Sequence, residues 1–121
     1  MSDHIRVHRI AVFARHGLLE EEARLGQRFY ISLDAVLDLA AAGRADDVAE
    51  TVSYADLTEI AVGIATERRF KLIEALAEAI AAEILARFAR IRTITVAVDK
   101  PSAPVPAILD GVTVAITRGR A

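Results

Sequence analysis

The segment Val98-Asp99-Lys100-Pro101-Ser102-Ala103-Pro104-Val105-Pro106 lies between two stretches in which apolar residues alternate with other residues, 94–98 and 112–116. Alternation with a period of two is typical of strands, so we predict a strand, a loop and a returning strand. All three prolines of the chain are in this loop. Because the proline ring fixes φ and removes a backbone donor, we expect a stiff loop that marks where the strand stops.

Lys100 stands where the strand ends and the proline-rich loop begins. Many lysines in such positions are simply solvated. In a regular strand, however, Lys100 points to the same side as Val96 and Val98, towards apolar surroundings. A partly desolvated ammonium at that place is suited to proton transfer. The sequence leaves both interpretations open.

The composition limits the classes of function. With 121 residues the chain is expected to form a single domain over 1–121. It has no cysteine, which excludes disulfides, thiolate metal sites and a cysteine nucleophile. A net charge of −2 with mixed signs lacks the basic stripe that nucleic-acid binding requires. Neither a signal peptide nor an apolar run long enough for a membrane span is recognisable, so we expect a soluble, cytoplasmic protein.

Two further strands are predicted near the N-terminus. Apolar residues alternate over 5–12, with an offset near His8-Arg9 that indicates a β-bulge, and again over 29–39. The polar connection 15–27 between them is too long for a tight hairpin turn, and such connections often carry functional residues.

Two helices are predicted in the middle of the chain, after an acidic connection at 40–51. Ser53-Tyr54-Ala55-Asp56 matches the helix-start signature Ser/Thr-x-x-Asp/Glu, and helical spacing follows it over 54–68. A charged break then precedes a second helix with one apolar face, formed by Ile73, Leu76, Ala77, Ile80, Ile84, Leu85 and Phe88.

The resulting order, β-β-α-α-β-β, predicts an α+β fold in which two helices cover one face of a four-stranded antiparallel sheet. The other face and the sheet edges then need a cover. The hydrophobic fraction of 54% exceeds the usual ~45–50%, and a domain of this size cannot bury so much apolar surface alone. We therefore expect a homo-oligomer whose neighbouring subunits continue the sheet.

Three further candidates have a structural as well as a functional interpretation. Glu74 lies in the first turn of the second helix, where a carboxylate stabilises the helix by only ~0.3–1 kcal/mol. Alternatively, it accepts two parallel N–H bonds from a planar heterocycle, beside free backbone amides. Tyr54 suits a core aromatic with a surface hydroxyl, and the run Glu20-Glu21-Glu22 suits a solvated loop. The sequence alone does not choose in any of these cases.

Metal-ion and nucleotide motifs are not recognisable in the sequence. His4, His8 and His16 do not form a paired metal motif, so a zinc site is not predicted. An enzyme with this sequence would work with lysine, carboxylates, tyrosine and bound water, and no cofactor is expected.

Four sequence motifs together resemble the dihydroneopterin aldolase family over essentially the whole chain. The motifs are His16-Gly17 with Glu22 and Gly26-Gln27; Asp46-Asp47-Val48 with Thr51-Val52-Ser53-Tyr54; Leu72-Ile73-Glu74; and Lys100-Pro101-Ser102-Ala103-Pro104-Val105-Pro106. Each is weak alone, but the four occur in the family's order and spacing on the predicted frame. Val105, where isoleucine is frequent in the family, is a mild departure.

This resemblance implies the tunnelling fold, in which subunits join their sheets into a barrel, commonly as tetramers or octamers with sites at subunit boundaries. It implies Lys100 as the catalytic acid/base and Glu74 as the anchor of a pterin ring, with a backbone contact from Ile73 beside it. Glu22 and Tyr54, the latter from the adjacent subunit, complete the catalytic set, and Val52 is a further substrate-binding candidate.

The implied reaction of folate biosynthesis cleaves 7,8-dihydroneopterin into 6-hydroxymethyl-7,8-dihydropterin and glycolaldehyde, without a metal or a lysine Schiff base. The ring imine C6=N5 accepts the electrons of the broken bond. Alternatives are a 2′-epimerase of dihydroneopterin or its triphosphate, and a zinc enzyme of the same fold, of the pyruvoyl-tetrahydropterin synthase type. A non-catalytic oligomeric scaffold is the alternative from another class.

Overall fold

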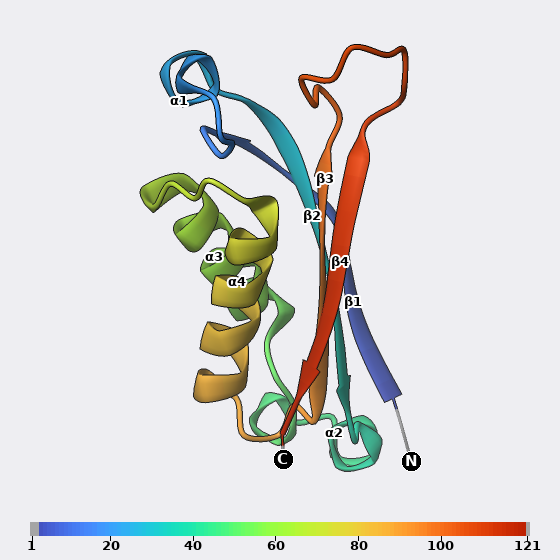
Figure 1. The fold of residues 1–121 in the computed structure, drawn as a ribbon. Coiled ribbons are helices and arrows are strands. Elements are labelled where there is room, and N and C mark those ends of the chain that lie inside the picture. Colours follow the sequence, from blue (N-terminus) through green and yellow to red (C-terminus); the bar gives the residue numbers. More distant parts are fainter. Residues whose placement is uncertain (1–2, 121) are drawn as a thin grey trace.

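The computed structural model describes residues 3–120. Its strands form one antiparallel sheet in the order β1-β2-β3-β4: β1 (Asp3–Ala14), β2 (Gln27–Leu37), β3 (Thr93–Lys100) and β4 (Val112–Gly119). Two long helices, α3 (Tyr54–Glu67) and α4 (Ile73–Arg87), lie on one face of this sheet (Figure 1). The predicted α+β fold with two helices on one face of a four-stranded sheet is confirmed.

The β-bulge predicted in the first strand is present. The pairing of β1 with β2 shifts register between Val7 and Ile10, and Arg9 has a φ of 51°. The Arg9 N–H leaves the regular ladder and donates to the Ser32 hydroxyl at 3.0 Å. The bulge adds one residue to β1, so that apolar positions before and after it stay on the same face of the sheet.

The core lies between the sheet and the two helices. Every second residue of β2 and β3 is buried there: Phe29, Ile31, Leu33, Ala35, Leu37, Ile94, Val96 and Val98. Leu57 and Ala61 of α3 and Leu76 and Ile80 of α4 meet them and are fully buried. Each large apolar side chain buried in this way contributes ~1.5–3 kcal/mol, so the parity of the strands is fixed by the core.

Both long helices begin where the sequence predicts and end one residue earlier, whereas β2 ends two residues before the predicted Leu39. The start of α3 differs in mechanism from the prediction. The Ser53 side chain makes no capping bond; instead its carbonyl oxygen accepts the N–H groups of Asp56 at 3.1 Å and Leu57 at 3.2 Å. Ser53 is thus a residue type that favours a helix start, and it marks the start of α3 without forming the capping box.

Two connections that we expected to lack regular structure contain short helices: α1 (Glu20–Leu25), α2 (Ala40–Ala45) and the 3-10 helix η1 (Val48–Glu50). In α1 the Glu22 carboxylate accepts the N–H of Leu19 at the helix start, at 3.2 Å. The helix ends at Gly26, whose φ of 69° favours glycine. Helices this short depend on such end contacts and not on a periodic pattern, which is why periodicity missed them.

The face of the sheet opposite the helices is polar. Arg9 forms an ion pair with Asp99 at 2.6 Å, and the hydroxyls of Thr95 and Thr117 are 2.7 Å apart. Neither β1 nor β4 pairs with a further strand within residues 3–120. Closure of these edges by neighbouring subunits into a barrel stays a prediction. In the same part of the chain, no helix is long and apolar enough to cross a membrane.

Candidate active site

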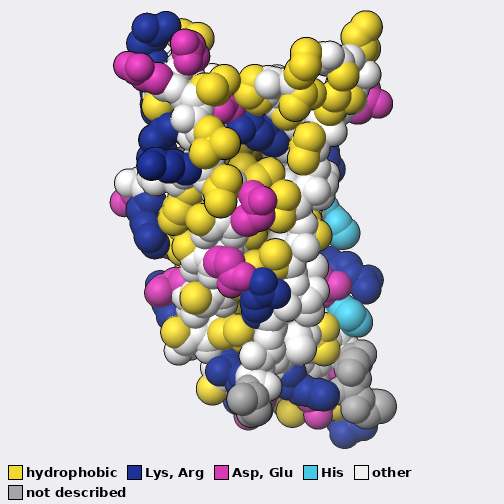
Figure 2. Space-filling model, viewed as in Figure 1, with side chains coloured by type: hydrophobic (Ala, Val, Ile, Leu, Met, Phe, Trp, Pro, Cys, Tyr) yellow, Lys and Arg dark blue, Asp and Glu magenta, His cyan; other side chains and the backbone are white. Residues whose placement is uncertain are grey.

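A cleft of about 370 Å³ opens at the end of the sheet where β3 stops. Three segments line it, namely 18–22 around the start of α1, 71–74 at the start of α4, and 100–105 with the facing part of β4. In Figure 2, hydrophobic side chains gather on both sides of the hollow at the upper end of the molecule. The cleft therefore combines apolar walls with a small number of charged groups, as small-molecule sites commonly do.

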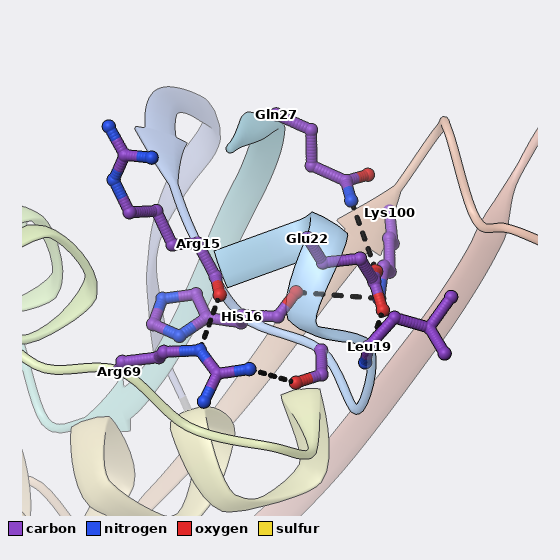
Figure 3. A network of polar contacts seen from close by, with 8 residues as sticks. Arg15, His16, Leu19, Glu22, Gln27, Arg69 and Lys100 are labelled. Atoms are coloured by element: carbon purple, nitrogen blue, oxygen red, sulfur yellow. Dashed lines mark hydrogen bonds and ion pairs between the residues drawn. The ribbon is translucent and has the colours of Figure 1, made fainter. Parts of the chain in front are cut away.

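Lys100 lies at the bottom of this cleft, and its predicted orientation is confirmed. The strand stays regular up to Lys100, which pairs with Val112, so its side chain follows Val96 and Val98 to the helix-covered side. Only 12% of the side chain is exposed. Its Nζ lies 2.5 Å from Glu22 Oε2 and 3.5 Å from the carbonyl oxygen of His16 (Figure 3). An ammonium has three hydrogens, so a third donor remains for a ligand.

The acidic run of α1 is not a uniform solvated loop, because one of its members is buried. Glu20 and Glu21 are exposed, whereas the Glu22 side chain is 8% exposed and uses both oxygens. Oε1 accepts the Leu19 N–H, and Oε2 accepts from Lys100 and, at 3.2 Å, from Gln27 Nε2. Burial alone would raise the pKa of Glu22, but the hydrogen bond from Lys100 and the other donors outweigh it and lower the pKa.

Gly17 makes room for this ion pair. Its φ of 148° lies in a region that residues with a side chain rarely adopt, and a Cβ at this position would overlap the Glu22 carboxyl group. The structure thus explains why the motif has a glycine after His16: the Glu22 carboxylate, which pairs with Lys100, occupies the space that a side chain at position 17 would need.

Glu74 and Ile73 form the opposite wall of the cleft, at the N-terminus of α4. Glu74 is exposed, and its carboxylate has no hydrogen bond or ion pair within residues 3–120. The Leu72 carbonyl accepts the N–H groups of Ala75 at 3.1 Å and Leu76 at 3.3 Å. The first two N–H groups of the helix, those of Ile73 and Glu74, have no intrahelical acceptor. A free carboxylate beside free backbone donors matches the edge of a flat heterocycle that carries both donors and acceptors.

The sequence predicts no role for Gln27, although the residue belongs to the first of the four motifs. It donates to Glu22, and its Oε1 is buried without a hydrogen-bond partner among the described residues. Buried polar atoms are almost always paired, so this oxygen is a ready acceptor for a polar ligand group beside the ion pair.

Tyr54 and Val52 do not lie in this cleft. They line a second one, of about 420 Å³, together with Ile5 and Leu39. Through the strand pairing, Ile5 is level with Ile94, six residues before Lys100, which places the second cleft roughly 20 Å away along the strands. The two clefts also lie at different sheet edges, β1 and β4, so one chain does not bring Tyr54 to Lys100. A contribution of Tyr54 from an adjacent subunit stays a prediction.

Two of the three histidines, His4 and His16, have structural partners. His4 lies 2.7 Å from Asp34, and His16 is fully buried between backbone groups. Within residues 3–120 no three His, Asp or Glu side chains are arranged to hold a metal ion.

A family model described as FolB, dihydroneopterin aldolase, matches residues 5–117. The chain belongs to this family. A dihydroneopterin aldolase of Methylorubrum extorquens is 72% identical over 120 residues, which cover 99% of this chain and 92% of the relative. The family and the enzyme class predicted from the four motifs are thereby confirmed.

Solved structures of dihydroneopterin aldolases have the same fold. The Escherichia coli enzyme, in complex with neopterin, superposes with a TM-score of 0.88 at 32% identity, covering 97% of this chain and 99% of that chain. The enzyme of Burkholderia thailandensis, bound to guanine, gives a TM-score of 0.82 at 26% identity, covering 99% and 93%.

Proposed function

We propose that the protein cleaves 7,8-dihydroneopterin into 6-hydroxymethyl-7,8-dihydropterin and glycolaldehyde, a step of folate biosynthesis. The observation that carries the proposal is the cleft itself. It presents the buried Lys100–Glu22 ion pair on one side and the free carboxylate of Glu74 on the other, in a chain of the dihydroneopterin aldolase family.

Glu74 binds the pterin ring in this proposal. Neopterin and guanine, the ligands of two structural relatives, share a pyrimidine edge with an amino group, a ring N–H and a carbonyl oxygen. The Glu74 carboxylate accepts from the first two, and a backbone N–H at Ile73 donates to the third. The apolar walls of the cleft cover the faces of the ring, and Val52, which lines the second cleft, joins them only from an adjacent subunit.

Lys100 moves the protons, through an ordered water. The neutral amine form of Lys100 removes the proton of the 2′-hydroxyl and becomes the ammonium, the C1′–C2′ bond breaks, and C2′ leaves as the aldehyde carbon of glycolaldehyde. The electron pair of the broken bond passes into the ring imine C6=N5, which gives an enamine. Lys100 then returns a proton to C1′, which completes the hydroxymethyl group. Glu22 and Gln27 position the hydroxyl groups of the substrate's side chain and the Lys100 ammonium relative to each other.

The same residues support 2′-epimerisation, because the enamine can add back to the other face of glycolaldehyde before the aldehyde leaves. The phosphorylated substrate remains the alternative for such an epimerase. Incubation of the purified protein with 7,8-dihydroneopterin and analysis of the products tests the main proposal. Glycolaldehyde and the hydroxymethyl pterin are expected in equal amounts; absence of both from an assembled protein would overturn it.

Tyr54 acts at the substrate hydroxyls from a neighbouring subunit, in a homo-tetramer or homo-octamer whose sheets form a barrel. The support is the separation of the two clefts at opposite edges of one sheet. Subunits with Lys100→Ala and with Tyr54→Ala, each inactive alone, should regain about a quarter of the sites when unfolded and reassembled as a mixture. If the mixture stays inactive, both residues belong to the same chain.

A further inference from the structure

His16 is a fully buried titratable residue that the proposed chemistry does not use. Its Nδ1 accepts the backbone N–H of Phe70 at 3.0 Å, so the ring hydrogen is on Nε2, which donates to the carbonyl oxygen of Ala65 at 2.9 Å. The ring packs against Phe29 and Phe70. Burial lowers the pKa of His16, and the nearby charges of Arg69 and Lys100 lower it further, against the raising effect of the Ala65 bond.

Arg69 also links the segment around His16 to the segment around Phe70. Its Nε donates to the carbonyl oxygen of Arg15 at 3.0 Å and its Nη2 to that of Gly17 at 2.7 Å (Figure 3). The Gly17 N–H in turn donates to the Phe70 carbonyl oxygen at 3.0 Å. With the two bonds of His16, these contacts join segment 15–17 to segment 65–70. We call the group His16, Gly17, Arg69 and Phe70 the bracket.

Each side of the bracket continues directly into one side of the cleft. Gly17 is followed by the segment that carries Glu22, and the His16 carbonyl oxygen itself accepts from Lys100. Phe70 is followed by the segment 71–74 that carries Glu74. The bracket therefore joins the side of the cleft that holds the ammonium to the side that we propose holds the ring.

We propose that the bracket, through His16 and Arg69, is a positioning device that sets the spacing between the Lys100–Glu22 pair and Glu74. This inference rests on the proposed function. A ring anchored at Glu74 presents its 2′-hydroxyl to Lys100 only at one spacing, and a misplacement of ~1 Å costs up to ~100-fold in rate. The bracket reaches the Lys100 end through the His16 carbonyl oxygen and through Gly17, which lies against the Glu22 carboxyl group, and it removes no group that binds the ring, so it acts on turnover more than on ring binding.

Arg69→Met tests the inference, because it removes both bonds to the 15–17 carbonyls and leaves Lys100, Glu22 and Glu74 in place. We expect kcat to fall ~10- to 100-fold, while the dissociation constant of neopterin changes by less than ~3-fold. Arg87→Met is the matched control. Arg87 is exposed, its one ion-pair partner within residues 3–120 is Glu83 at 3.7 Å, and it is remote from the bracket, so both quantities should stay within ~2-fold of wild type.

A pair of His16 variants separates positioning from mere stability. His16→Asn places an amide oxygen where Nδ1 accepts from Phe70, so it should retain kcat within ~5-fold, whereas His16→Leu keeps the volume but loses both bonds and should lose as much as Arg69→Met. If His16→Leu does not fold, Arg69→Met and His16→Asn decide the matter.

The outcomes of these experiments are distinct. Wild-type kcat in Arg69→Met, or an equal loss of kcat and of neopterin affinity, would overturn the positioning role. An inactive wild-type protein would instead overturn the proposed function. Selective loss of kcat in Arg69→Met, with Arg87→Met unchanged and His16→Asn active, supports the inference.

Discussion

The two ends of the cleft differ in how far the chain satisfies its own polar groups. At the Lys100 end, Glu22 is buried, uses both carboxylate oxygens and holds the ammonium at 2.5 Å. At the Glu74 end, the carboxylate is exposed and has no partner within residues 3–120. The charges of the first end are paired before any ligand arrives, although Gln27 Oε1 and one ammonium hydrogen stay available there, whereas the second end offers a charged group without a partner. Substitutions at the two ends should therefore change different quantities.

The largest effect is expected from Lys100→Ala, which removes the group that we propose moves the protons. General acid–base catalysis contributes ~10²–10⁴-fold, so kcat should fall by about that factor. Neopterin binding should stay within ~10-fold of wild type, because Glu74 is untouched. Steady-state kinetics and a fluorescence titration with neopterin measure the two quantities. A Lys100→Ala variant with near-wild-type kcat would remove the distinction between the ends.

Gly17→Ala should damage the Lys100 end of the cleft without removing a charged group. The new methyl group overlaps the Glu22 carboxyl group and forces an unfavourable φ, so Glu22 must move away from Lys100. A loss of kcat of roughly 10²-fold is expected, in line with a misplaced catalytic group.

Gly43→Ala is the control for this substitution. Gly43 lies in α2, and a Cβ there would meet no atom of the described residues within 4 Å. Its kcat should be unchanged, and its stability should rise by ~0.5–1 kcal/mol because alanine favours the helix. Equal kinetics for the two alanine variants would mean that Glu22 does not need its present position.

Glu74→Ala should affect the Glu74 end of the cleft alone, and therefore mainly the binding of the ring. Hydrogen bonds to a charged group contribute ~1.5–3 kcal/mol, so the neopterin dissociation constant should rise ~10- to 100-fold. At saturating substrate, kcat should fall much less than in Lys100→Ala. A Glu74→Ala variant that binds neopterin normally would show that the ring is held elsewhere.

The smallest effect concerns stability against pH. The pKa of His16 is lower in the folded chain than the ~6.5 of an exposed histidine, so below that pH the unfolded chain binds more protons. Stability contributed by neutral His16 is thus complete above about pH 6.5 and is lost as the pH falls towards the folded pKa. Arg69 and Lys100 carry the charges that oppose protonation of His16.

Denaturant unfolding at pH 7.5 and pH 5.5 measures this dependence. Wild type should lose more stability between the two values than His16→Asn, which cannot take up this proton. The same loss in both proteins would show that groups other than His16 account for it.

Much of the frame could be predicted because it follows from local periodicity. Alternation placed the core faces of β2 and β3, and its parity put Lys100 on the helix-covered side. The offset near His8-Arg9 correctly indicated the bulge. Four motifs in order were enough for the family. Residue type and periodicity did not distinguish Glu22 from its two neighbours in α1, because all three have the same side chain; only the family resemblance singled it out, and in the structure burial separates the three.

Arg69 shows most clearly what could not be predicted from the sequence. In the sequence it belongs to a charged break between two helices, and its type and spacing give no signal of function. In the folded chain it binds two backbone carbonyls more than fifty positions away. Backbone carbonyls carry no side-chain signature, so a contact of this kind cannot be recognised before the chain is folded.

The sequence by itself determined the order of elements, the face to which Lys100 points and the family, because periodicity and short motifs are local properties. Only the tertiary structure decided that Glu22 closes on Lys100 while Glu74 stays open, that the bracket joins the two ends, and that Tyr54 lies near the other end of the sheet. These facts depend on groups distant in sequence meeting at set distances, and packing of the whole core fixes those distances.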